Sequence, residues 1–187
     1  GEPFLRDDLA ELVRYASEEY SLKVNVISNG TLITKTALEN LRSAGMTLLE
    51  VTILSHDQTV HAKLTCRDTL RDALAGASLA EKLDVPLVIG TVGTSINIGD
   101  MAKVADIAFA LSAKGLMFNR FNPGGRGIAN VAEMMPTKDQ LANALAVLDG
   151  KSKEYMLPVT ANVPIPPCVL DTKKYKRIRF GYCPAGG

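Results

Sequence analysis

Apolar and β-branched residues gather in short runs that alternate along the chain with longer segments whose apolar positions recur at helical spacing. The short runs predict strands and the longer segments predict helices. The predicted strands cover residues 23–27, 48–54, 85–92 and 116–119, and the helices that follow them cover 34–44, 69–82, 101–114 and 138–155. A further amphipathic helix is predicted ahead of the first strand, with Leu9, Leu12, Val13 and Ala16 on its apolar face. The pattern therefore predicts four strand–helix units in succession.

The predicted strands begin about 25 to 37 residues apart, which is close to the length of a β-α-β unit. They are apolar on both faces, as parallel strands covered by helices are. The fold class is therefore α/β with a parallel sheet. Two architectures satisfy this pattern, a doubly wound open sheet and a β/α barrel or partial barrel.

Polar residues and glycines follow the end of each predicted strand, at residues 28–30, 55–57, 94–97 and 119–127. In a barrel the loops at the carboxyl ends of the strands meet on one rim, where such folds place their active sites. In an open sheet only the loops at the switch point meet. Four loops of similar composition favour the barrel.

The pattern changes after residue 155, where prolines stand at positions 158, 164, 166 and 167. Proline interrupts helices, so this stretch is expected to be a connector, followed by a short strand-like run at 177–180. We predict a barrel domain over residues 1–157 and, over 158–187, a connector and the start of a second module.

Composition places the chain among ordinary globular proteins, because 47% of its residues are apolar and its net charge is +1. No run approaches the roughly 18 uninterrupted apolar residues that a membrane span needs, and no secretory signal is visible. The balanced charge gives no indication of a nucleic-acid partner, and the basic cluster at 173–179 is expected to be a solvated edge. We expect neither a membrane nor a nucleic acid as partner.

Three cysteines, Cys66, Cys168 and Cys183, are too few and too scattered for a disulfide framework. Their number favours a reducing compartment and therefore a cytoplasmic protein.

Several short motifs occur in a fixed order along nearly the whole chain: Gly1-Glu2-Pro3, then residues 28–30, 51–55 and 119–127, and finally Cys168 followed by Cys183-Pro184-Ala185-Gly186. This ordered set resembles the radical S-adenosylmethionine (radical SAM) enzymes that carry a SPASM-type C-terminal extension. The resemblance implies a partial (β/α)6 TIM-type barrel, truncated at its N-terminal strand, and the start of an auxiliary-cluster extension. It also implies a [4Fe-4S] cluster that reduces S-adenosylmethionine to a 5′-deoxyadenosyl radical, which abstracts hydrogen from a substrate.

In that family a CxxxCxxC loop upstream of a Gly-Gly-Glu-Pro turn holds the cluster. This chain starts inside such a turn, with one glycine and without the cysteine loop. We therefore expect a fragment that lacks the primary cluster ligands and is inactive by itself.

Gly1, Glu2 and Pro3 are predicted to bind the cofactor. A glycine turn lets backbone carbonyls approach an ammonium such as the methionyl amine, and the proline fixes the turn. The resemblance further implies that Ser55 directs its hydroxyl toward the ribose of S-adenosylmethionine and that Arg67 contacts its carboxylate. The family's usual Ser-Leu-Asp-Gly is replaced here by residues 55–58, Ser-His-Asp-Gln.

Cys168 and Cys183 have fourteen residues between them, and thiolates are the usual ligands of iron–sulfur clusters. The resemblance implies that both bind an auxiliary [4Fe-4S] cluster. The alternative is a pair of buried, inert thiols. Cys66 lies outside the pattern and is expected to be structural.

Pro184 directly follows Cys183, at a position where sulfatase-maturing members of the family carry an aspartate. The resemblance therefore argues against formylglycine chemistry and leaves peptide-modifying maturases and cofactor-pathway enzymes such as those of haem or quinone biosynthesis. The implied partners are a peptide or small-molecule cofactor precursor as substrate and an electron donor.

His56, Asp57 and His61 suggest a second function, because two imidazoles and a carboxylate could hold a divalent metal in an aldolase-like or phosphate-binding barrel enzyme. The favoured interpretation is structural: Asp57 caps the following turn and His61 packs locally. Residues 124–127, Gly-Gly-Arg-Gly, could cradle an anion, although a tight turn is more usual. A third possibility is a non-catalytic remnant that folds but binds nothing.

Overall fold

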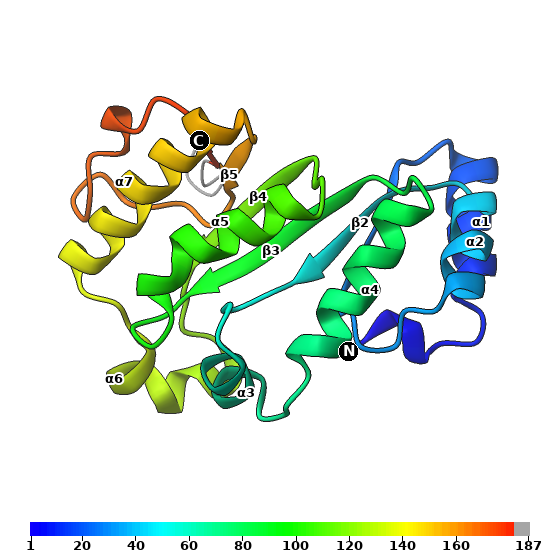
Figure 1. Cartoon of the computed structure of the whole chain (residues 1–187), viewed down its shortest axis with the longest axis horizontal. Helices are drawn as coiled ribbons and strands as arrows, with labels where there is room; N and C mark the ends of the chain where they lie inside the picture. The colour runs from blue at the N-terminus through cyan, green and yellow to red at the C-terminus, as the bar shows by residue number, and fades with distance from the viewer. Residues whose placement is uncertain (182–187) are drawn as a thin grey trace.

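Six parallel strands form one sheet in the computed structural model, which describes residues 1–181 (Figure 1). They are β1 (Val24–Ser28), β2 (Met46–Thr52), β3 (Leu87–Gly93), β4 (Gly115–Arg120), β5 (Val159–Ala161) and β6 (Ile178–Phe180). The strands pair in chain order from β1 to β6, so the sheet has no switch point. This order is that of a barrel, and among the described residues β1 and β6 remain unpaired on one side. The predicted partial barrel is confirmed, with the sheet open.

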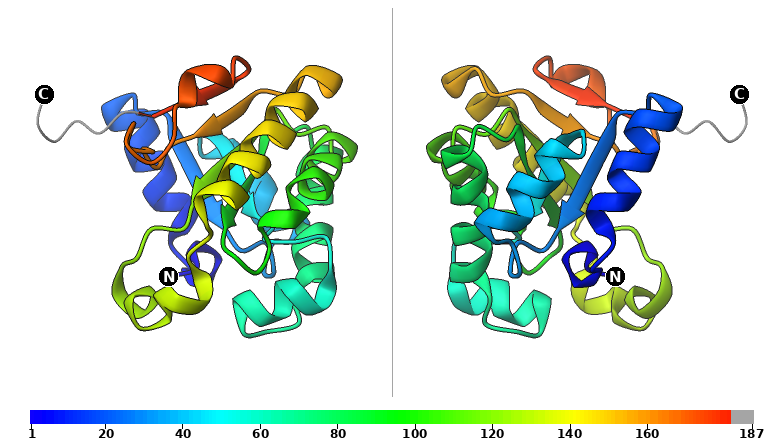
Figure 2. Two further views of the ribbon diagram at one scale, coloured as in Figure 1. Left: turned by 90° about the vertical axis from the view of Figure 1, so that its left-hand side faces the viewer. Right: turned by 90° about the vertical axis from the view of Figure 1, so that its right-hand side faces the viewer.

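The helices lie on the outside of the curved sheet (Figure 2). They are α1 (Leu9–Tyr20), α2 (Lys35–Ser43), α3 (Gln58–Thr65), α4 (Leu70–Lys82), α5 (Met101–Ala110), α6 (Val131–Met134) and α7 (Lys138–Tyr155), with short 3-10 turns η1 (Pro3–Leu5), η2 (Ile98–Asp100), η3 (Gly125–Asn130) and η4 (Thr172–Lys174). The helices predicted after each strand are confirmed as α2, α4, α5 and α7. None of the helices within residues 1–181 is long and apolar enough to cross a lipid bilayer.

Local sequence explains where several helices begin. The Thr34 side chain accepts a hydrogen bond from the Ala37 N–H at the start of α2. Thr137 and Gln140 form a capping box at the start of α7, in which each side chain accepts a hydrogen bond from the other residue's backbone N–H. These caps satisfy backbone donors that the first helical turn leaves free.

The hydrophobic core lies between the convex face of the sheet and the helices. Strand residues of this face are almost fully buried, among them Leu49 and Val51 of β2, Ile89 of β3, and Leu116 and Phe118 of β4. Because side chains alternate along a strand, the residues between them point to the opposite, concave face.

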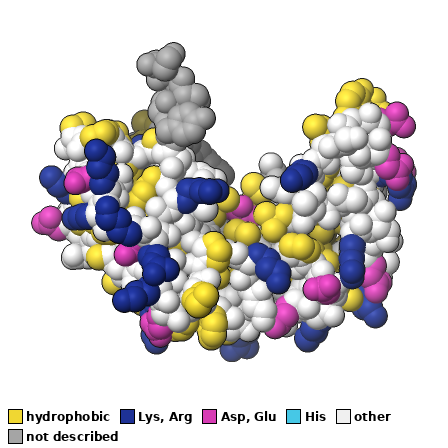
Figure 3. All heavy atoms as spheres, turned by 90° about the horizontal axis from the view of Figure 1, so that it is seen from above, with side chains coloured by type: hydrophobic (Ala, Val, Ile, Leu, Met, Phe, Trp, Pro, Cys, Tyr) yellow, Lys and Arg dark blue, Asp and Glu magenta, His cyan; other side chains and the backbone are white. Residues whose placement is uncertain are grey.

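The concave face forms a trough between two wings of the molecule (Figure 3). Hydrophobic side chains line much of this trough, and acidic surface shows among them. The register places Ile27 of β1, Glu50 of β2 and Val88 of β3 in one row across it. Ile27 is 57% exposed, so the β1 end of the row is open to solvent.

The proline-rich stretch after residue 157, expected to be a connector, contributes two strands to the sheet. The expected strand at 177–180 corresponds to β6, whereas β5 was missed because three residues beside a proline carry too weak a pattern. The segment between them contains no α-helix, and it packs Ile165, Leu170 and Tyr175 into the core. The division into two modules stays a prediction.

Candidate active site

Glu2 orders the loop that follows β1. Its Oε1 accepts hydrogen bonds from the Ser28 hydroxyl at 2.7 Å and from the Phe4 N–H at 3.2 Å. Its Oε2 accepts one from the Asn29 N–H at 2.8 Å, and the Ser28 hydroxyl in turn accepts one from the Gly30 N–H at 2.9 Å. The Glu2 carboxylate thus positions the loop at the carboxyl end of β1.

The backbone of the predicted cofactor turn is mostly engaged as well. The carbonyls of Glu2 and Pro3 accept hydrogen bonds from the N–H groups of Leu5 and Arg6, at 3.3 and 3.0 Å. Within residues 1–181 the Gly1 carbonyl accepts none. Of these three residues, Gly1 therefore has the carbonyl that is available to an ammonium group.

Gly30 holds the β1 loop tightly against α4. Its φ of +81° lies in the left-handed region, and a Cβ on it would lie 2.8 Å from Val51 Cγ1 and 2.9 Å from Ala73 Cα. A Cβ on Gly76 of α4 would come within 2.2 Å of the Gly30 carbonyl oxygen. Both glycines are needed for this close approach of loop and helix.

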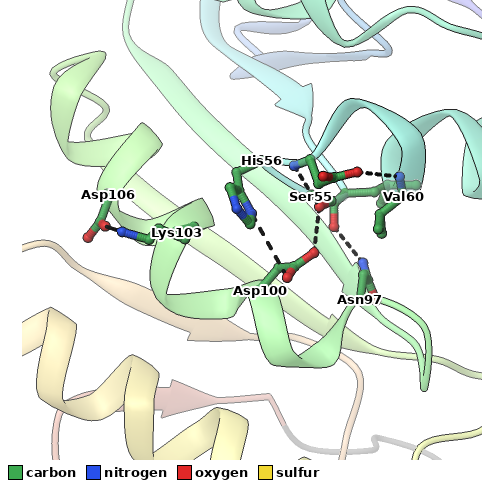
Figure 4. A network of polar contacts seen from close by, with 9 residues as sticks. Ser55, His56, Val60, Asn97, Asp100, Lys103 and Asp106 are labelled. Atoms are coloured by element: carbon green, nitrogen blue, oxygen red, sulfur yellow. Dashed lines mark hydrogen bonds and ion pairs between the residues drawn. The ribbon is translucent and has the colours of Figure 1, made fainter.

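Ser55 lies at the centre of a polar network between the β2 loop and η2 (Figure 4). Its side chain is fully buried, and its hydroxyl donates a hydrogen bond to Asp100 Oδ2 at 2.5 Å and accepts one from the Asp57 N–H at 3.0 Å. The His56 Nδ1 lies 3.9 Å from Asp100 Oδ1. The structure thus gives Ser55 a positioning role, and its predicted contact with the cofactor ribose stays a prediction.

Asn97 joins the carboxyl ends of β2 and β3, a role that the sequence did not reveal. Its buried Nδ2 donates hydrogen bonds to the carbonyls of Leu54 and Val92, at 2.5 and 2.9 Å. Its Oδ1 accepts from the Thr94 N–H and the Thr94 hydroxyl, at 2.7 and 2.8 Å. One amide therefore satisfies four buried or part-buried polar groups and links two rim loops.

The favoured structural interpretation of Asp57 and His61 is confirmed. Asp57 caps α3, because its Oδ1 accepts a hydrogen bond from the Val60 N–H at 2.9 Å. His61 is buried and its Nδ1 accepts one from the Leu54 N–H at 3.3 Å. Burial lowers the pKa of His61, which keeps the ring in the neutral form that this contact requires.

The metal site considered for the aldolase-like alternative is not present. In the part of the chain that the structure describes, no group of three or more His, Cys, Asp or Glu side chains could hold a metal ion. Residues 124–127 form a tight turn, in which the Gly127 N–H donates to the Gly124 carbonyl at 2.9 Å, and lead into η3.

Arg67 lies on a rim cleft of about 700 Å³ between the end of α3 and the η3–α6 segment. Ile96 and Phe121 form part of its lining, and Lys63 and Glu133 form an ion pair of 2.8 Å there. The predicted contact between Arg67 and a cofactor carboxylate stays a prediction.

The two cysteines that the structure describes, Cys66 and Cys168, are both exposed. Cys66 ends α3 in the left-handed conformation, with φ of +58°, and is exposed. Cys168 is exposed between β5 and β6, so it is not the buried, inert thiol of the alternative interpretation. Cys183 lies outside the described residues, and the expected meeting of its sulfur with that of Cys168 stays a prediction.

The sequence analysis did not identify two polar residues on the concave face, Glu50 and Thr52. Glu50 is only 8% exposed, and burial raises the pKa of its carboxyl group. Thr52 follows at the end of β2, half-buried, and within residues 1–181 its hydroxyl makes no hydrogen bond. An alternation of polar and apolar residues at 49–53 was the available signal. The apolar residues on either side dominate this run, so it predicts a strand buried on both faces.

Two groups could hold S-adenosylmethionine. The Gly1 carbonyl, next to the Glu2 that binds Ser28 at the end of β1, fits an ammonium, and the Thr52 hydroxyl at the end of β2 fits a ribose hydroxyl. Ser28 pairs with Val51, the residue before Thr52, so the ends of these two strands are neighbours. A [4Fe-4S] cluster has no such site among the described residues, because they offer no set of thiolates that could bind it.

Comparison with known proteins gives this geometry a context. Residues 1–108 match the Radical SAM superfamily. The chain is 32% identical over 128 residues to the AdoMet-dependent heme synthase of Methanosarcina barkeri, an alignment that covers 68% of this chain and 36% of that protein. It is 28% identical over 160 residues to the PqqA peptide cyclase of Rhodopseudomonas palustris, covering 80% of this chain and 40% of that protein.

A solved structure agrees at the level of the fold. Streptococcus suis SuiB bound to its precursor peptide SuiA superimposes with a TM-score of 0.70 at 15% identity, over 88% of this chain and 37% of SuiB. The chain therefore spans well under half the length of these relatives. Since the superfamily match covers more than half of the chain and includes both the Glu2 loop and the β2–β3 rim, the chain belongs to the radical SAM superfamily.

Proposed function

We propose that the chain is the barrel part of a longer radical SAM enzyme that modifies a peptide. The observation that carries this proposal is the superfamily match over the residues that build the rim, from the Glu2 loop to η2. When bound and reduced, S-adenosylmethionine supplies a 5′-deoxyadenosyl radical. The chain's own residues would hold it through the Gly1 carbonyl and the Thr52 hydroxyl.

The peptide substrate is supported by two similar proteins, a PqqA peptide cyclase and SuiB in complex with a precursor peptide. A cofactor precursor is the second candidate, because the heme synthase shares 32% identity with this chain. The open trough is compatible with an extended substrate that crosses the rim (Figure 3). An electron donor would be the second partner, and a cytoplasmic location would suit the cluster's need for a reducing environment.

The primary cluster would be held by a CxxxCxxC loop in the longer protein, upstream of Gly1. An auxiliary [4Fe-4S] cluster would use Cys168 and Cys183 in a SPASM-type extension. These assignments rest on the resemblance of the motifs to the family.

The test uses the full-length protein, reconstituted anaerobically with iron and sulfide and supplied with a reductant. We expect it to cleave S-adenosylmethionine to 5′-deoxyadenosine and methionine, measured by liquid chromatography, and we expect the 187-residue chain to release neither. Absence of a cysteine triplet upstream of Gly1, or product formation by the 187-residue chain, would overturn the proposal.

A further inference from the structure

Glu50 is a largely buried residue on the concave face of the barrel, and its carboxylate oxygens remain accessible to solvent. Its side chain is 8% exposed, yet within residues 1–181 it makes no hydrogen bond and no ion pair. Arg179 of β6, a basic residue that the register places on the same face, does not pair with it. Buried carboxylates are usually paired, because removal of the charge from water is unfavourable.

Gly90 of β3 makes room for this carboxylate. A Cβ on Gly90 would lie 2.4 Å from Glu50 Oε1, 3.1 Å from its Cδ and 3.2 Å from its Cγ. The Glu50 side chain therefore extends across the bare backbone of the neighbouring strand. The sequence at both positions is needed for this arrangement, since any side chain at Gly90 would displace the carboxylate.

The neighbours of Glu50 on the adjacent strands are apolar, whereas Thr52 follows it on the same face of β2. Ile27 and Val88 flank it across the sheet, and Met117 lies in the adjacent row, beyond Gly90. A carboxylate accepts hydrogen bonds and attracts a positive charge, whereas an apolar floor binds a hydrocarbon chain. The two features together match a group that has a cationic end on an aliphatic stem.

We infer that Glu50 is a recognition residue for a cationic nitrogen of the substrate, such as the ammonium group of a lysine side chain in a peptide. The inference rests on the proposed function, because it names a substrate feature for the same barrel. Glu50 binds the charged nitrogen, Ile27 and Val88 contact the stem, and Gly90 keeps the carboxylate at the floor of the trough. No bond is made or broken by Glu50 in this role.

The test measures binding rather than turnover. The ¹⁵N-labelled 187-residue chain is titrated with N-acetyl-lysine methylamide, and the backbone amide signals of β2 and β3 are followed by NMR. N-acetyl-norleucine methylamide, which has the stem without the ammonium, is the matched ligand control. We expect Glu50→Gln to weaken binding of the lysine probe about tenfold or more and to leave the weak norleucine binding unchanged.

Two further variants distinguish the specific effect of the Glu50 carboxylate from the loss of any negative charge and from a change in its position. Glu39→Gln removes an exposed carboxylate on α2 and should bind the lysine probe like the parent chain. Gly90→Ala retains the Glu50 charge but displaces it, and should lose binding to a similar extent. Equal affinity in the parent chain and Glu50→Gln, no binding to the parent chain, or signal changes remote from β2 and β3 would each overturn the inference.

S-adenosylmethionine also carries positive charge, so it is titrated separately. If it competes with the lysine probe and loses affinity in Glu50→Gln, then Glu50 serves the cofactor and the inference is wrong. If the lysine probe binds at Glu50 but the full-length protein fails to cleave S-adenosylmethionine, the proposed function fails while the cation site stands.

Discussion

Asn97 holds the ends of β2 and β3 together through four hydrogen bonds, two of them buried and two part-buried. Asn97→Ala removes these bonds and leaves the carbonyls of Leu54 and Val92 without the donor they have now. We expect the free energy of unfolding to fall by about 3 kcal/mol, because each unsatisfied buried group is unfavourable by about 1 to 3 kcal/mol. Urea denaturation measures the change.

Asn143→Ala is the control for this variant, since Asn143 is exposed on α7. Its effect should stay within about 0.5 kcal/mol. If both variants unfold at the same urea concentration, the Asn97 hydrogen bonds contribute nothing to the stability of the protein.

The hydroxyls of Thr52 and Ser55 have different predicted roles at the same strand end. Thr52→Val keeps the shape but removes a free hydroxyl, so it should weaken S-adenosylmethionine binding by the full-length protein about fivefold and leave stability nearly unchanged. Ser55→Ala removes the partner of Asp100 and should lower stability by about 1 to 3 kcal/mol. Isothermal titration calorimetry and urea denaturation distinguish the two effects.

A loss of cofactor affinity in Ser55→Ala with unchanged stability would contradict the positioning role. It would instead support the direct contact between Ser55 and the ribose that the family resemblance implies.

At the scale of elements, α5 and α7 are linked by one polar cluster on the outside of the barrel. Asp106 of α5 accepts hydrogen bonds from Tyr155 of α7 and forms an ion pair with Lys151, at 2.7 and 2.9 Å. Phe109 stacks on the Tyr155 ring with centroids 4.3 Å apart. The Lys151 contact, followed by that of Tyr155, lowers the pKa of Asp106 to about 2.

This pKa predicts a pH-dependent contribution to stability. A carboxyl group whose pKa is lowered on folding stabilises the protein above its unfolded pKa of 3.8, and this stabilisation is lost as the pH falls through about 2. Asp106→Asn should therefore be less stable than the parent at pH 7, and the difference should shrink as the pH falls from about 3.8 through about 2. Thermal unfolding measured across this pH range checks the prediction. A stability difference between the parent and Asp106→Asn that does not change with pH would contradict it.

At the scale of the whole molecule, the sheet follows chain order without reversal and is open at β1 and β6 within residues 1–181. The described residues supply no metal-binding group of their own. In the longer enzyme proposed above, other segments would supply the ligands that complete the two proposed clusters.

Cys168 and Cys66 provide a matched pair for the auxiliary cluster, because both are exposed. In the reconstituted full-length protein we expect Cys168→Ser to lose about four irons per chain and Cys66→Ser to lose none, since one [4Fe-4S] cluster depends on Cys168. Iron analysis and absorption spectroscopy measure this. Equal iron content in the two variants would remove the auxiliary-cluster assignment.

The pattern of apolar residues was sufficient to predict the parallel sheet and the helices that cover it. Its strongest signals were long and periodic, as in the helix at 138–155, whose bounds agree with α7. Two short elements were not predicted. The helix α3 follows His56 and Asp57, which suggested a metal-binding loop, and the strand β5 consists of three residues. Local propensity is too weak to specify elements of that length.

The sequence by itself determined the α/β class, the succession of strand–helix units and the superfamily to which the motifs point. Those properties depend on local periodicity and on residue order, and both can be determined from the linear sequence. The tertiary structure decided that Ser55 binds Asp100, that Asn97 joins β2 to β3, and that Glu50 lies over Gly90. These pairs are 40 to 45 positions apart or depend on strand register, so only the packing of strands and loops brings them together.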